Sequence, residues 1–175
     1  MKADVFTMDI KAIRARARQH MEEGAKTPGY KAKAETVVKL LNEALATELV
    51  CVLRYRRHYF MASGMNSESV KEEFLQHAEE EQEHADRIAE RIVQLGGQPN
   101  FSPEGIASRS HSEYVEGKDL QDMIKEDLVA ERVAIDSYRA MIEYIAGDDP
   151  TTRRMLEDIQ AKEEEHAEDL ASLLA

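Results

Sequence analysis

The chain has 175 residues with four prolines and eight glycines, and its 35 acidic and 23 basic residues give a net charge of −12 at neutral pH. This length suits one domain with a sizeable hydrophobic core, and the acidic balance disfavours binding to nucleic acid or to anionic membranes. The sequence has no apolar run near the roughly 18 residues of a membrane span. Since Cys51 is the only cysteine, an intrachain disulfide is excluded, and we expect a cytoplasmic protein without membrane contact.

Residues 1–34 differ from the rest of the chain in charge. They contain eight basic and four acidic residues, whereas residues 35–175 contain 15 basic and 31 acidic ones. We predict an N-terminal extension over residues 1–34, with a short helix at about residues 9–23. An apolar side with Ile10 and Ile13 should pack against the bundle or a neighbouring subunit. The opposite face is basic and carries Lys11, Arg14 and Arg18.

Four long helices are predicted in residues 35–175. They are expected at about residues 35–63, from Ser67 to Gly96, from Asp119 to Gly147, and from Pro150 almost to the C-terminus. The first has apolar residues mostly at three- and four-residue steps, with Phe60 on the side assigned to the core. Residues 97–118 contain Pro99 and Pro103 and are too long for a tight turn, so they should cross the length of the bundle. The fold class is therefore all-α, a four-helix bundle of two antiparallel hairpins joined by a long crossover.

One pattern of residues occurs twice along these helices. A Glu in an apolar helix has a Tyr seven residues later and a Glu-x-x-His motif that begins 32 or 33 residues later. The first copy comprises Glu48, Tyr55, Glu81 and His84, and the second comprises Glu131, Tyr138, Glu163 and His166. Positions i and i+3 are neighbours on a helix, so each motif can present both side chains to one metal ion.

The residue types in this repeat favour a two-metal site. Four buried carboxylates need compensating positive charge, and carboxylate with imidazole suits iron or manganese. We predict that the four Glu and two His residues are the metal ligands. Tyr55 and Tyr138 should hydrogen-bond metal-binding carboxylates across the bundle. His77 is predicted to be an ordinary polar residue, and the remaining histidines are assigned to the surface or to loops: His20, His58 and His111.

The segments around these motifs resemble the bacterioferritins. The matching segments are Leu41–Leu49 for the first helix, His77–Ala85 for the second, Leu128–Glu131 for the third and Glu163–His166 for the fourth. The resemblance covers about residues 36–174 and implies a ferritin-like bundle with a di-iron ferroxidase site. It also implies that Glu81 and Glu163 bridge the irons, that Glu48 and Glu131 are terminal ligands, and that His84 and His166 bind one iron each.

Three features differ from the bacterioferritin pattern. Gln82 stands where that family has its haem-binding Met, so no haem is expected. Only nine residues follow His166, too few for the family's fifth helix. With the N-terminal extension, these features resemble the bacterioferritin-related, Dps-like proteins that build 12-subunit cages, although the thiol-bearing members have a Cys pair that this chain lacks.

The favoured function is Fe(II) oxidation by dioxygen or hydrogen peroxide, with iron storage in a homo-oligomer, expected to be a cage. A rubrerythrin-like peroxidase would use a similar site without storing mineral, but it normally needs an iron held by four cysteines. A manganese catalase would use a similar ligand set. A DNA-shielding shell would use the basic residues of the extension, which the acidity of the remaining chain opposes.

Overall fold

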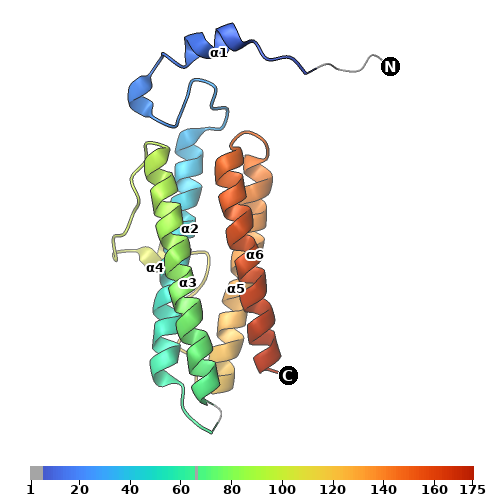
Figure 1. Cartoon of the computed structure of the whole chain (residues 1–175). Helices are drawn as coiled ribbons and strands as arrows, with labels where there is room; N and C mark the ends of the chain where they lie inside the picture. Colours follow the sequence, from blue (N-terminus) through green and yellow to red (C-terminus); the bar gives the residue numbers. More distant parts are fainter. Residues whose placement is uncertain (1–5, 66) are drawn as a thin grey trace.

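The computed structural model describes residues 6–65 and 67–175, and all its regular elements in these ranges are helices (Figure 1). Four long helices form a bundle: α2 (Ala34–Met61), α3 (Ser67–Gln94), α5 (Leu120–Ile145) and α6 (Pro150–Leu173). Helix α2 packs mainly on α3, and α5 packs mainly on α6. The predicted four-helix bundle of two hairpins is therefore confirmed. None of the described helices is long and apolar enough to cross a membrane.

The crossover between α3 and α5 runs beside α2 and includes the short helix α4 (Ile106–Arg109), which the sequence did not predict (Figure 1). Two side chains of α2 hold its backbone. Asn42 Oδ1 accepts a hydrogen bond from the Asn100 amide at 2.7 Å, and Thr47 Oγ1 accepts one from the His111 amide at 2.9 Å. At Gly97 a Cβ atom would lie 2.6 Å from Val38 Cγ1, so only glycine lets the chain leave α3 so close to α2.

Aspartate side chains fix the starts of both helices of the second hairpin. The Asp119 side chain accepts a hydrogen bond from the Asp122 amide, and the Asp149 side chain accepts one from the Thr152 amide, each at 2.9 Å. Asp149 also accepts from Arg91 of α3 at 2.9 Å and from the Tyr30 hydroxyl at 2.8 Å. This one carboxylate therefore joins α3, α6 and the segment that precedes α2.

The N-terminal extension forms less helix than the sequence predicted. Helix α1 covers only Ile10–Arg16, and a single 3-10 turn follows at Met21–Glu23. The α-helix ends at Arg16, and the left-handed backbone of His20, with φ at 51°, separates it from the 3-10 turn. Figure 1 shows α1 beyond the end of the bundle, and none of its residues is buried. The prediction that Ile10 and Ile13 pack against the chain's own bundle is therefore wrong, since these side chains are 44% and 40% exposed.

Two apolar clusters fill the bundle, one on either side of a polar layer. One cluster surrounds Leu45, Ile88 and Ile159, and the other surrounds Tyr55 and Phe74. Their separation follows the sequence, because each long helix carries its Glu or Glu-x-x-His residues between two apolar stretches. Cys51 is buried in the second cluster.

Phe60 does not lie in the core, although the apolar pattern assigned it there. It is 76% exposed. The buried side of this part of α2 passes through Tyr55, His58 and Ala62. Phe60 lies two residues from both His58 and Ala62, about 200° around the helix, and so faces away from the core.

A buried charged group connects the two hairpins next to the second cluster. Arg54 Nε lies 2.7 Å from Asp127 Oδ1, and His58 Nδ1 lies 2.8 Å from Asp127 Oδ2. Arg54 also donates to the Glu113 carbonyl at 2.8 Å, which holds the crossover. The assignment of His58 to the surface is wrong, because Asp127 supplies a buried partner that local spacing does not reveal. His20 and His111 are exposed, as predicted.

Candidate metal centre

The six predicted ligands converge in the polar layer between the two apolar clusters. One comes from α2 and one from α5, while α3 and α6 each supply two. Each is at most 5% exposed: Glu48, Glu81, His84, Glu131, Glu163 and His166. The layer therefore contains four carboxyl groups and two imidazoles away from solvent.

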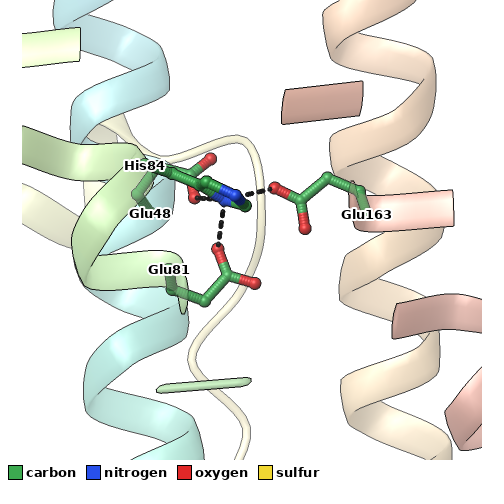
Figure 2. Close-up of side chains that lie close together, drawn as sticks. All are labelled: Glu48, Glu81, His84 and Glu163. Carbon is green, nitrogen blue, oxygen red and sulfur yellow. Dashed lines mark ion pairs between the residues drawn. The ribbon is translucent and has the colours of Figure 1, made fainter. Parts of the chain in front are cut away.

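The first half of the centre surrounds His84. Its Nδ1 lies 3.1 Å from Glu163 Oε1, 3.3 Å from Glu48 Oε2 and 3.6 Å from Glu81 Oε2. Figure 2 shows the three carboxylates directed at the His84 ring, with Glu163 facing it from the opposite hairpin. This half thus draws its residues from α2, α3 and α6.

The second half surrounds His166 and uses the other oxygens of the shared carboxylates. Its Nδ1 lies 3.3 Å from Glu81 Oε1, 3.3 Å from Glu163 Oε2 and 3.9 Å from Glu131 Oε2. Glu81 and Glu163 therefore direct one oxygen into each half. Glu131 faces only this half.

These atoms form two sets that could each hold a metal ion. Within each set of four residues the ligand atoms lie within 4.8 Å of one another. Seven of them are buried without a hydrogen-bond partner: Glu48 Oε2, Glu81 Oε1, His84 Nδ1, Glu131 Oε2, Glu163 Oε1 and Oε2, and His166 Nδ1. Unpaired buried polar atoms are costly, and coordinated cations would satisfy all seven at once. The residues therefore fit a pair of divalent metal ions.

Two tyrosines orient Glu48 and Glu131, the carboxylates that each face a single half of the centre. The Tyr55 hydroxyl of α2 donates to Glu131 Oε1 of α5, and the Tyr138 hydroxyl of α5 donates to Glu48 Oε1 of α2. The predicted contacts across the bundle are thus present. Each hydroxyl occupies one carboxylate oxygen and leaves the other directed into the centre.

The carboxyl groups divide into two kinds by their acidity. Burial, with the nearby charge of Glu81, raises the pKa of Glu48 to about 8, and burial likewise raises the pKa of Glu131 well above its usual value. Burial also acts on Glu81 and Glu163, but it is outweighed: a hydrogen bond with Glu48 and contacts with the two histidines lower the pKa of Glu81, and contacts with the two histidines lower that of Glu163. Glu48 and Glu131 therefore hold their protons more strongly than Glu81 and Glu163 do.

The imidazoles face the carboxylates of Glu81 and Glu163. Burial alone would lower the pKa of His166, but contacts with Glu163 and Glu81 raise it to about 11. Contacts with Glu163, Glu48 and Glu81 likewise raise the pKa of His84 far above its usual value. Positive charge on these imidazoles would offset the negative charge of Glu81 and Glu163 and so lower the cost of burying the metal-free centre.

Two further side chains contact His166 and were not predicted to belong here. Glu80 Oε2 lies 2.6 Å from His166 Nε2, which fixes the ring and directs Nδ1 into the centre. The His77 ring stacks on His166 with centroids 4.0 Å apart and is fully buried, so it is not the ordinary polar residue expected. Burial and the neighbouring His166 lower the pKa of His77 to about 3. Helical spacing was the available signal, since His77 lies about one turn before Glu81 and Glu80 lies directly before it.

A four-helix bundle with paired carboxylate and histidine half-sites defines a class of helical metal-binding proteins. Residues 38–175 match the family of ferritin-like domains. The chain belongs to this family, as the sequence resemblance predicted.

Three relatives illustrate the relationship. Bacterioferritin of Mycobacterium avium is 31% identical over 139 residues, which are 79% of this chain and 83% of that protein. The nutrient stress-induced DNA-binding protein of a Synechococcus strain is 31% identical over 138 residues, 77% of this chain and 78% of that protein. A dodecameric thioferritin, the bacterioferritin-related protein of Bacteroides fragilis, superimposes with a TM-score of 0.79 at 32% identity, covering 82% of this chain and 87% of that structure.

Proposed function

We propose that the protein oxidises Fe(II) at this centre and stores the ferric product. The supporting observation is that the oxygens of two carboxylates are divided between the two halves of the centre. Glu81 and Glu163 each offer one oxygen to the His84 half and one to the His166 half. Carboxylates placed in this way would bridge two ions and keep both within reach of one oxidant molecule. The six Glu and His residues are the proposed ligands, with iron as the metal and manganese as the alternative.

The side chains contribute positioning and exclusion of water. Two bound Fe(II) ions would supply one electron each, and dioxygen or hydrogen peroxide would take up both electrons with two protons. Tyr55 and Tyr138 hold Glu131 and Glu48 in place. The apolar clusters on both sides keep bulk water from the layer.

We further propose that the chain assembles into a homo-oligomeric cage. The related thioferritin is described as dodecameric, and residues 35–175 carry 31 acidic and 15 basic residues, enough to attract cations to a cavity. Electron microscopy with iron analysis tests this proposal. A hollow particle that retains many irons per subunit supports storage, whereas a small oligomer with about two irons per subunit would favour a rubrerythrin-like peroxidase.

Metal binding should release protons and weaken as the pH falls. Below about pH 8 the Glu48 carboxyl is protonated in the metal-free centre, and a cation must displace that proton. We expect the apparent affinity for Zn(II) to rise by up to about tenfold per pH unit for each displaced proton between pH 6 and 8. Calorimetric titration in buffers of different ionisation enthalpy measures the released protons. An affinity for Zn(II) that does not change between pH 6 and 8 would contradict the assignment.

The purified protein is expected to have no Soret absorbance, even when haem is supplied during expression. Gln82 offers an amide where bacterioferritins have a thioether, and amides are poor ligands for haem iron. Its Nε2 already donates to Asp86 at 3.0 Å along α3. Roughly one haem per two subunits, measured by the pyridine haemochrome assay, would refute this expectation.

A DNA-shielding shell is the second candidate, because one relative is named a DNA-binding protein and the extension is basic. We instead propose that the extension contacts a neighbouring subunit, since it leaves Phe6 83% and Met8 59% exposed. Deleting residues 1–30 should weaken the assembly, as followed by size-exclusion chromatography, and should also lower its thermal stability. Neither form should shift DNA at about 0.1 M salt. A shift by the intact protein alone would favour the shielding shell.

A further inference from the structure

A third group of possible cation ligands lies beside the His166 half of the centre. It comprises Glu73 and His77 on α3 and Asp169 on α6. His77 Nε2 lies 3.3 Å from Glu73 Oε1 and 3.9 Å from Asp169 Oδ2. One ligand atom from each residue lies within 4.8 Å of the others. The side chain of Asp169 is 48% exposed and that of Glu73 is 30% exposed, so the group opens to solvent.

The hydrogen bonds of the neighbouring tyrosine determine which nitrogen of His77 is free. His77 Nδ1 lies 3.3 Å from the Tyr55 hydroxyl. That hydroxyl has a single proton, which it donates to Glu131. Its oxygen can therefore only accept from His77, so the neutral ring carries its proton on Nδ1. His77 Nε2 then presents a lone pair.

This lone pair faces negative charge and has no hydrogen-bond partner. The His77 side chain is 0% exposed, and its Nε2 is buried and unpaired. The lone pair points toward the carboxylates of Glu73 and Asp169, which repel it and each other. A divalent cation between the three groups would remove the repulsion and complete the coordination of Nε2.

We propose that Glu73, His77 and Asp169 bind a third divalent transition-metal ion per subunit, with water completing its coordination on the exposed side. His77 connects this ion to the dinuclear centre, because the same ring stacks on His166 and contacts Tyr55. The binding site stands on its own residues, and only its connection to iron oxidation rests on the proposed function.

The test counts Zn(II) ions bound by the intact protein in equilibrium dialysis. The variant Glu73→Gln/Asp169→Asn removes both charges with little change of shape and keeps His77. The control Glu72→Gln/Glu168→Gln removes two exposed carboxylates of the same helices. We expect the first variant to bind one Zn(II) fewer per subunit than wild type, and the control to bind as many as wild type. An unchanged count in the first variant, or an equal loss in the control, overturns the proposal.

A third variant separates this proposal from the proposed function. Glu81→Ala should lose Zn(II) from the dinuclear centre and keep the third ion, which the further changes Glu73→Gln and Asp169→Asn should then remove. If Glu81→Ala binds as much Zn(II) as wild type while Glu73→Gln/Asp169→Asn loses one ion, the dinuclear proposal fails and the third site stands. If Glu73→Gln/Asp169→Asn loses all its Zn(II), these carboxylates only support the dinuclear centre, and the third site is refuted.

Discussion

Replacing Glu81 with alanine is expected to abolish rapid Fe(II) oxidation while the bundle stays folded. Glu81 directs one oxygen at each histidine of the centre, at 3.6 Å from His84 and 3.3 Å from His166, so both half-sites lose a ligand. Loss of even an outer partner of a metal ligand costs about 10–100-fold, so we expect slowing by roughly 100-fold or more. Stopped-flow absorbance under limiting Fe(II) measures the rate.

The matched control for this variant is Glu83→Ala, which removes an exposed carboxylate two residues further along α3 and should oxidise Fe(II) at the wild-type rate. The metal-free Glu81→Ala protein should stay folded, because an imidazole that loses its Glu81 partner at 3.3–3.6 Å can release its proton and become neutral. Oxidation by Glu81→Ala at the wild-type rate would exclude Glu81 as a bridging ligand.

Replacing Asp127 with asparagine is expected to cause a large loss of stability. Asp127 is 0% exposed and pairs with both Arg54 and His58. Removing one partner from a buried ion pair leaves an uncompensated charge and typically costs about 3–5 kcal/mol. At about 2–4 °C per kcal/mol for a protein of this size, the Tm should fall by roughly 10 °C. Thermal unfolding followed by circular dichroism measures the shift.

Asp136→Asn is the control for this second prediction. Its side chain is on the same helix, is 79% exposed and pairs with Arg139 at the surface, so its loss should change stability by no more than about 0.5 kcal/mol. Equal shifts in Tm for the two variants would show that the buried charges are not what stabilises this region.

The sequence was sufficient to predict the bundle and the residues that meet at its centre. A Glu-x-x-His motif fixes its own geometry, because both residues lie on one helical face. The repetition of the pattern on four helices predicted that the four Glu and two His residues would meet, while the shared position of Glu81 and Glu163 was implied by the resemblance to bacterioferritins. Loop length predicted the pairing of helices, and the aspartate at the start of α6 predicted that helix's first turn.

The residues that were missed depend on contacts between distant segments. His58 was assigned to the surface because its partner, Asp127, lies 69 residues away in sequence. Glu80 was not singled out because it lies among Glu79, Glu81 and Glu83, and only the position of α6 shows which of these reaches His166. A charged residue on the apolar face of a long helix, such as Arg54, is the signal that could have revealed the buried network.

The reciprocal tyrosine contacts make the two hairpins depend on each other during folding. Contacts within each hairpin join segments close in sequence and form readily, whereas docking of one hairpin on the other must close the long crossover. A cation that binds between Glu48 and Glu163 recognises only the docked arrangement and so shifts the folding equilibrium toward it. The supply of metal during synthesis would then influence how much of the chain matures, before any iron is oxidised.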